Sequence, residues 1–162
     1  MRLSTKAQYA VTAMVDVALE EAAGPVSLAA VASRQALPQA YLEQLFAKLR
    51  KAGLVKSSRG PSGGYSLARK AEDVQILDIL AAVDISPKAT RCEGGSSAGC
   101  RLAGGQCLTH DLWDELGAVI QMFLMRVTLA DVCEKRIVGM GRFGLFMDPL
   151  FLKTYEKSQV AA

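Results

Sequence analysis

Three of the four cysteines and the only histidine fall within nineteen residues, from Cys92 to His110. Their spacing is C-x7-C-x6-C-x2-H, in a stretch rich in glycine and serine. Thiolates favour zinc, copper(I) and iron–sulfur clusters, and imidazole completes such sites. Glycines let the backbone fold around a metal and offer it N–H groups. The stretch, which spans residues 85–107 and continues to His110, therefore predicts a metal centre.

The type of ligand alone leaves the metal open between zinc and an iron–sulfur cluster. Zinc-binding cysteine pairs are usually separated by roughly two to four residues, and the wider gaps here suit a two-iron cluster better. Cys107 and His110 lie one turn apart at the expected start of a helix, so their side chains converge on one face. The remaining cysteine, Cys133, is interpreted as a small buried residue of a later helix.

A long apolar helix is expected from Leu108 to Val127. An apolar stripe over so wide an arc must be buried, either in the core of the same chain or against a second subunit, and we favour the second subunit. The residues predicted to form this dimer interface are Leu112, Leu116, Ile120, Phe123 and Leu124.

A second helix is expected to follow the apolar one. Thr128 with Asp131 resembles a capping box for the segment ADVCEKRIV. Residues 108–140 are therefore interpreted as dimerisation helices, and residues 141–162 as a tail with no assigned role.

The first 84 residues have the element order of a winged helix-turn-helix. Ser4 or Thr5 caps a first helix that runs to about Ala23, and Ser27 caps a short second helix. Pro38 suits the first turn of a third helix.

The third helix is expected to end at Gly53 and to lead into a β-hairpin. VKSSR and YSLAR are strand-like and flank the loop GPSGG, so they predict the hairpin that forms the wing. The segment VQILDILAAVD closes this unit near Asp84. The predicted fold class is mainly α with a small β-hairpin.

The third helix has the features of a recognition helix, whose amino-terminal residues reach base edges in the major groove. Five cations and no acid lie between Lys48 and Arg59, as expected for phosphate contacts. The glycines of the wing loop are expected to let its backbone lie close to DNA. The residues predicted to contact DNA are Gln39, Ala40, Tyr41, Glu43, Gln44, Lys48, Arg50, Arg59, Pro61 and Gly63.

The charge distribution supports a polyanionic partner for the first half of the chain. Residues 1–70 carry ten basic and four acidic side chains, whereas residues 71–162 carry nine and twelve. The alternative is a winged helix that binds protein and has a solvated basic face. The outward Gln and Glu at the start of the recognition helix favour double-stranded DNA.

The sequence has no recognisable targeting segment and no run of eighteen apolar residues. No membrane partner is expected, and the protein is expected in the cytoplasm, where cysteines stay reduced. The only histidine is already used as a metal ligand, and no nucleotide or flavin loop occurs. The chain is therefore not expected to be an enzyme. An electron-transfer iron–sulfur protein and a zinc-stabilised interaction module are the alternatives to a DNA-binding regulator.

Three segments resemble the iron–sulfur cluster regulators of a bacterial family of winged-helix repressors. These are MRLSTKAQYAVTAMVDVAL, YLEQLFAKLRKAGLVKSSRGPSGGY and CLTHDLW, and the resemblance covers roughly residues 1–135. The first two segments mark the wider family, and three cysteines followed by CLTH mark the cluster-regulator branch. The cysteine gaps are slightly longer than usual in that branch. Pro38 and Ala40 stand where family members often have serines, so hydroxyl contacts to DNA are lost there.

The resemblance implies a homodimeric transcription factor, mainly a repressor of cluster-assembly genes, that binds promoter operators. It implies one [2Fe–2S] cluster per subunit, delivered by a cluster donor such as an assembly scaffold. Other branches of the family recruit an acidic residue from the first helix, where this chain has Gln8. The implied ligands are Cys92, Cys100, Cys107 and His110.

Overall fold

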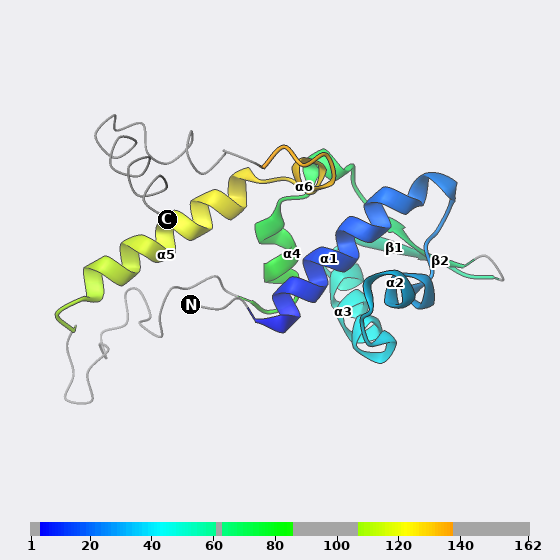
Figure 1. Ribbon diagram of the computed structural model, residues 1–162, viewed down its shortest axis with the longest axis horizontal. Helices are drawn as coiled ribbons and strands as arrows, with labels where there is room; N and C mark the ends of the chain where they lie inside the picture. Colours follow the sequence, from blue (N-terminus) through cyan, green and yellow to red (C-terminus); the bar gives the residue numbers. More distant parts are fainter. Residues whose placement is uncertain (1–3, 61–62, 86–106, 138–162) are drawn as a thin grey trace, which may run out of the picture.

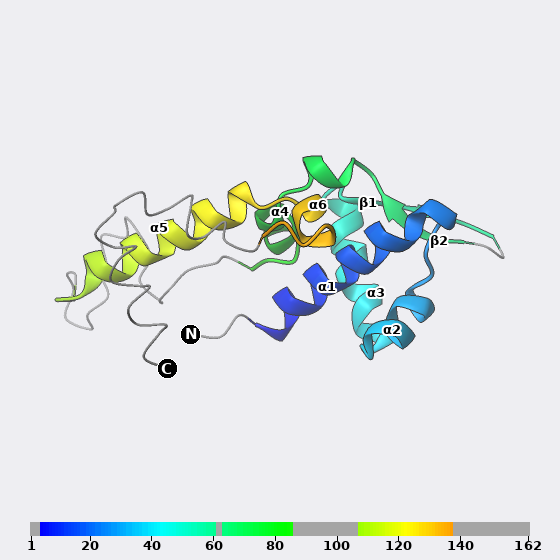
Figure 2. The same ribbon diagram turned by 45° about the horizontal axis from the view of Figure 1, so that its top comes forward.

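The computed structural model describes residues 4–60, 63–85 and 107–137. It is mainly helical with one antiparallel hairpin, and α5 and the hairpin lie at opposite ends of the molecule (Figures 1 and 2). The elements are α1 (Thr5–Glu20), the 3-10 helix η1 (Glu21–Ala23), α2 (Leu28–Gln35), α3 (Gln39–Lys51), β1 (Val55–Ser58), β2 (Gly64–Leu67), the 3-10 helix η2 (Ala71–Asp73), α4 (Ile76–Ala82), α5 (His110–Arg126) and α6 (Leu129–Cys133).

Local capping signals place the starts of α1 and α2. The hydroxyl of Ser4 accepts a hydrogen bond from the backbone N–H of Ala7, and Ser27 caps α2 in the same way, each at 3.2 Å. Both predicted caps are confirmed. Pro38 precedes α3 as its N-cap residue instead of lying within its first turn.

A glycine in the left-handed region ends α3, as predicted. Gly53 has φ +72°, its N–H donates to the carbonyl of Arg50, and the N–H of Leu54 donates to the carbonyl of Leu49. This pair of bonds is the Schellman motif, which satisfies the last carbonyls of a helix. The chain then turns directly into the wing.

The wing is a two-stranded hairpin that is also tied to the segment before α2. Val55 to Ser58 pair with Leu67 to Gly64, and Val26 and Tyr65 exchange two backbone hydrogen bonds of 2.8 Å. A Cβ on Gly64 would lie 2.5 Å from the backbone of Val26. Gly64 therefore allows a close approach within the protein, in addition to any role toward DNA.

A single cluster of buried side chains joins α1, α2, α3, α4 and the base of the wing. Its largest fully buried members are Met14, Leu42, Leu45, Phe46 and Leu49. Burial of this apolar surface is the main stabilising contribution to the fold. The same cluster also contains residues from the far end of the chain, Val127 and Leu129.

Helix α6 packs against α1 and belongs to the winged-helix body. The N–H of Ile76 donates to the carbonyl of Val127 (2.9 Å), and the N–H of Leu129 donates to the carbonyl of Val74 (2.8 Å). The sequence pattern predicts α6 among the dimerisation helices of residues 108–140. Its packing places it instead with the unit expected for residues 1–84.

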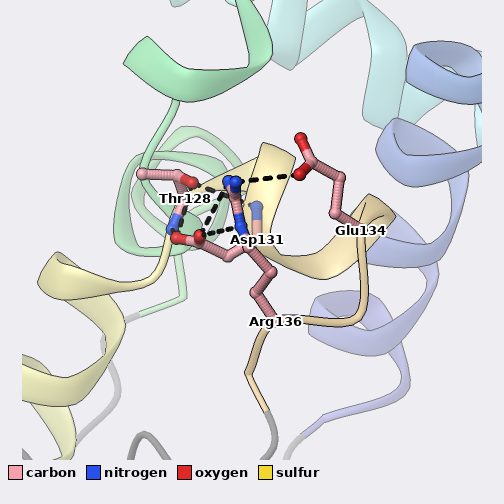
Figure 3. Close-up of polar contacts among 4 residues, drawn as sticks. All are labelled: Thr128, Asp131, Glu134 and Arg136. Carbon is pink, nitrogen blue, oxygen red and sulfur yellow. Dashed lines mark hydrogen bonds and ion pairs between the residues drawn. The ribbon is translucent and has the colours of Figure 1, made fainter.

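The capping box of α6 is confirmed, but the helix is shorter than expected. Figure 3 shows the hydroxyl of Thr128 accepting from the N–H of Asp131 (3.1 Å) and the Asp131 carboxylate accepting from the N–H of Thr128 (2.9 Å). The helix ends at Cys133 because Lys135 has φ +56°. Arg136 then turns back to form ion pairs with Asp131 and Glu134.

A buried carboxylate ties α1 to α2. Asp16 accepts two hydrogen bonds from the guanidinium of Arg34 and one of 2.7 Å from the amide of Gln35. Burial alone would raise the pKa of Asp16, but these hydrogen bonds and the charge of Arg34 outweigh burial and hold the pKa below its usual value. This cluster fixes the first helix of the helix-turn-helix on the core.

We expect Asp16→Asn to lower the free energy of unfolding at pH 7 by about 2 kcal/mol. The loss is smaller than the roughly 3–5 kcal/mol for a fully buried pair because Arg34 reaches solvent. The pKa of Asp16 is lower in the folded protein than in the unfolded chain, where it is about 3.9, so the ionised carboxylate stabilises the fold at pH values above about 3.9. This stabilisation disappears as the pH falls through the pKa of the folded protein. The difference between wild type and variant should therefore shrink only below about pH 4.

Denaturant unfolding at several pH values measures this difference. Asp73→Asn, which removes an exposed carboxylate from η2, is the control and should change stability little. Equal stability of Asp16→Asn and wild type at pH 7 would contradict the role of this cluster.

Candidate DNA interface and metal ligands

Helix α3 separates a buried face from an exposed polar face, as predicted. Leu42, Leu45, Phe46 and Leu49 are buried. Tyr41 is half-buried and meets the ring of Tyr9 edge-on, with 5.9 Å between centroids. The exposed residues of α3 that were predicted to contact DNA are Gln39, Ala40, Glu43, Gln44, Lys48 and Arg50.

The amino end of α3 presents a paired amide and carboxylate. The side-chain N–H of Gln39 donates to Oε1 of Glu43 at 3.1 Å, one helical turn away. Glutamine can pair with adenine, and a carboxylate can accept only from amino groups such as that of cytosine. The pair can therefore discriminate among base edges in a major groove.

The carboxyl end of α3 is linked to the wing. The guanidinium of Arg50 donates to the hydroxyl of Ser57 at 3.4 Å, and Lys56 and Arg59 are exposed on the hairpin. The N–H of Gly63 donates to the carbonyl of Gly60 (2.9 Å), which closes the loop. Pro61 lies outside the described residues. The exposed cations of α3 and the wing form a surface suited to phosphates.

Lys48 is exposed on α3, as predicted, but its ammonium group forms an ion pair with the carboxylate of Asp84. Lys6 of α1 lies 3.6 Å from the same carboxylate. Asp84 could not be identified from the sequence, because its partners Lys48 and Lys6 are far away along the chain. This contact joins the recognition helix to the end of α4.

Two of the four predicted metal ligands are described. His110 is the first residue of α5 and is buried, and its N–H donates to the carbonyl of Cys107 at 3.0 Å. Cys107 is half-exposed, with its sulfur 3.8 Å from the hydroxyl of Thr109. The thiol and the imidazole are one turn apart at the start of a helix, which fits ligands of one centre. The helix begins two residues later than expected.

The other two predicted ligands, Cys92 and Cys100, lie outside the described residues. Within the described part of the chain, no three side chains of the metal-binding types gather at one point. Cys133 is in α6 and packs against the core, and burial raises the pKa of its thiol. A raised pKa disfavours the thiolate form that metals need.

Helix α5 extends away from the winged-helix body (Figure 2). Of the predicted dimer residues, Leu112 is 61% exposed, and Leu116 and Ile120 are half-buried. Phe123 and Leu124, near the other end, pack partly against the core of their own chain. The stripe is therefore divided between an intrachain contact at Phe123 and Leu124 and an exposed apolar part at Leu112 and Trp113. Met122 and Met125 of the same helix are exposed as well.

Comparison with known proteins identifies the family. The model of Rrf2, described as an iron-dependent transcriptional regulator, matches residues 3–135. The chain belongs to the Rrf2 family. It is 49% identical over 138 residues to the HTH-type transcriptional regulator IscR of Escherichia coli, which covers 85% of this chain and 83% of that protein.

Solved structures of related proteins share the fold. The structure of T. potens IscR has a TM-score of 0.68 and 36% identity, and the match covers 93% of this chain and 96% of the T. potens chain. CymR, the global cysteine regulator of B. subtilis, has a TM-score of 0.69 and 30% identity, and the match covers 83% of this chain and 98% of CymR.

The comparisons confirm several predictions from the sequence. The chain is a DNA-binding transcriptional regulator of the Rrf2 family with a winged helix, and it is not an enzyme. None of the helices in the described ranges is long and apolar enough to cross a lipid bilayer. The individual DNA contacts and metal ligands remain predictions for this Rrf2 member.

The wing of this Rrf2 protein should contact DNA through Arg59. If Arg59 binds a phosphate, Arg59→Ala should weaken binding to all duplexes alike and reduce the slope of log affinity against log salt by about one. If it enters a minor groove, the loss should depend on A·T content. Fluorescence anisotropy with duplexes of differing composition measures both effects.

Lys70→Ala is the matched control for Arg59→Ala. It removes one exposed positive charge, paired with Glu72 at 3.3 Å, from the segment that follows the wing. If Arg59→Ala leaves the affinity and its salt dependence unchanged on every duplex, Arg59 does not contact DNA.

Proposed function

We propose that this chain is a homodimeric regulator that senses iron–sulfur cluster supply and controls cluster-assembly genes. It binds promoter DNA through α3 and the wing, and it holds one [2Fe–2S] cluster per subunit. The observation that carries the proposal is the position of Cys107 and His110 at the start of α5, one turn apart. Helix α5 connects this position to the winged-helix body, against which Phe123 and Leu124 pack.

The proposed ligand set is Cys92, Cys100, Cys107 and His110. When bound, a [2Fe–2S] cluster supplies a redox-active centre that is held by thiolates and, in some proteins, by histidine. The buried position of His110 limits the freedom of its imidazole, and the backbone hydrogen bond holds the main chains of Cys107 and His110 close together. The cluster is expected to come from an assembly scaffold.

The dimer is proposed to form through the exposed apolar face of α5. Leu112 and Trp113 lie on this helix, beyond the winged-helix body, and are more than one third exposed in the single chain. Exposed apolar residues on the same side of a helix as Leu116 and Ile120 are typical of a protein interface. A two-fold dimer places two copies of α3 on two half-sites of an operator.

Capture of genomic fragments tests the proposed function. Purified protein with and without its cluster is mixed with sheared DNA of the source organism, and bound fragments are sequenced. We expect enrichment of regions upstream of cluster-assembly genes, with a difference between the two forms. Enrichment of the same fragments in both forms would contradict cluster sensing but not DNA binding.

A further inference from the structure

The end of α4 has an acidic residue where glycine is favoured. Asp84 has φ +57°, its N–H donates to the carbonyl of Ala81, and the N–H of Ile85 donates to the carbonyl of Leu80. These bonds form a Schellman motif, in which the left-handed residue is usually glycine because a side chain is disfavoured there. The aspartate is therefore expected to contribute an interaction that glycine would lack.

The side chain of Asp84 bridges two other helices. Its carboxylate accepts a hydrogen bond from the ammonium of Lys48 in α3 and lies 3.6 Å from the ammonium of Lys6 in α1. The hydrogen bond from Lys48, together with its charge, lowers the pKa of Asp84, and the same hydrogen bond raises the pKa of Lys48. Both groups are thus charged at neutral pH and attract each other.

The contact between Lys48 and Asp84 is exposed to solvent. The side chain of Asp84 is 69% exposed and that of Lys48 is 44% exposed. An exposed ion pair is weak and can be replaced by another anion. Lys48 lies one turn after Gln44 on the polar face of α3, which is the predicted DNA-binding face. When DNA is bound there, its phosphates are the anions that compete with Asp84 for Lys48.

We infer that Asp84 is a built-in competitor of DNA for Lys48. While its carboxylate holds the ammonium group, Lys48 is withheld from phosphate, and the negative charge of Asp84 stands close to the DNA-binding face. Asp84 therefore lowers the affinity of the winged helix for DNA. Moving Asp84 away from α3 releases Lys48 and removes this charge.

The place of Asp84 in the chain gives this competition a regulatory consequence, which rests on the proposed function. Asp84 stands eight residues before Cys92 in the sequence, and α5, whose first residue is His110, approaches α4 at its other end (Figure 1). One proposed ligand thus follows α4 closely in sequence, and the helix that begins at another contacts α4 through its far end. Loading the ligands is expected to change how strongly Asp84 holds Lys48.

A double-mutant cycle tests the competition in protein without iron. Wild type, Asp84→Gly, Lys48→Ala and the double variant are titrated onto a mixed-sequence 30-base-pair duplex over a range of salt. Glycine suits the left-handed position, so the fold should be retained. Asp84→Gly should bind about threefold to tenfold more tightly at low salt, with a slope steeper by about one, because one more phosphate is contacted. In the Lys48→Ala background Asp84→Gly should give a clearly smaller gain than in wild type, because only the negative charge of Asp84 is then removed and no lysine is released.

Asp78→Asn is the control for net charge, because it removes a carboxylate of the same helix that lies 3.7 Å from Arg69. An equal gain for Asp78→Asn, or the same gain from Asp84→Gly when Lys48 is absent, would overturn the competition. An unchanged affinity of Asp84→Gly would do so as well. Wild type that does not bind the duplex at all would instead contradict the DNA-binding function.

The regulatory consequence is tested by repeating the cycle after anaerobic cluster loading. The gain from Asp84→Gly should then differ from the gain in iron-free protein. The same gain in both forms would overturn the link to the ligands and leave the competition intact. Asp84→Asn, which also tolerates a left-handed conformation, provides a second variant should Asp84→Gly fold poorly.

Discussion

Replacing Cys107 with alanine should reduce the iron content of anaerobically purified protein at least ~10-fold. The loss of a direct ligand is expected to exceed the roughly 10- to 100-fold effect of changing an outer-shell partner. Cys133→Ala is the matched control, because this thiol packs against the winged-helix core and burial raises its pKa. It should keep wild-type iron content. Iron analysis and the visible spectrum measure both variants.

A change of ligand type should have the opposite effect on lifetime. His110→Cys replaces a neutral imidazole with a negatively charged thiolate, a softer ligand that iron–sulfur clusters favour. We expect the visible absorption of this variant to decay more slowly in air than that of wild type. Faster decay would contradict the assignment of His110 as the weaker ligand of the set.

Ile120→Glu should weaken the dimer on the order of 100-fold and weaken operator binding with it. A carboxylate in an apolar interface loses its hydration without gaining a partner, which costs several kcal/mol. Sedimentation velocity across a concentration range measures the dimer, and anisotropy measures DNA binding. Both should shift together, because half-sites are bound by paired recognition helices.

Two further variants separate the interface from folding. Leu112→Glu changes a residue that is 61% exposed in the single chain, so it should weaken the dimer without unfolding the subunit. Gln121→Glu adds the same charge at an exposed polar position of α5 and should leave the dimer intact. Dimers of normal strength in both Ile120→Glu and Leu112→Glu would assign the stripe to another role.

The elements that local signals define could be predicted from the sequence. Ser27 before a short apolar pattern, Gly53 after a longer one, and Thr128 with Asp131 each act within one turn of the chain. Their effect depends on hydrogen bonds to nearby backbone groups, so distant residues matter little. The polar face of α3 could be predicted from the regular spacing of the apolar residues on its other face.

Contacts between distant segments could not be predicted in this way. Asp16 meets Arg34, and Lys48 meets Asp84, across 18 and 36 positions. Val127 and Leu129 continue an apolar pattern in the sequence, yet they complete the core of the first domain. A hydrophobic stripe shows that a face is buried but not which surface buries it. Pairing of such segments depends on the tertiary fold.

Anaerobic purification followed by visible absorption and analysis of iron, acid-labile sulfide and zinc tests the central claim most directly. The account predicts red-brown protein with about two iron and two sulfide ions per chain, and little zinc. Colourless protein with about one zinc ion per chain would contradict it, and would identify the cysteine-rich segment as a structural metal site.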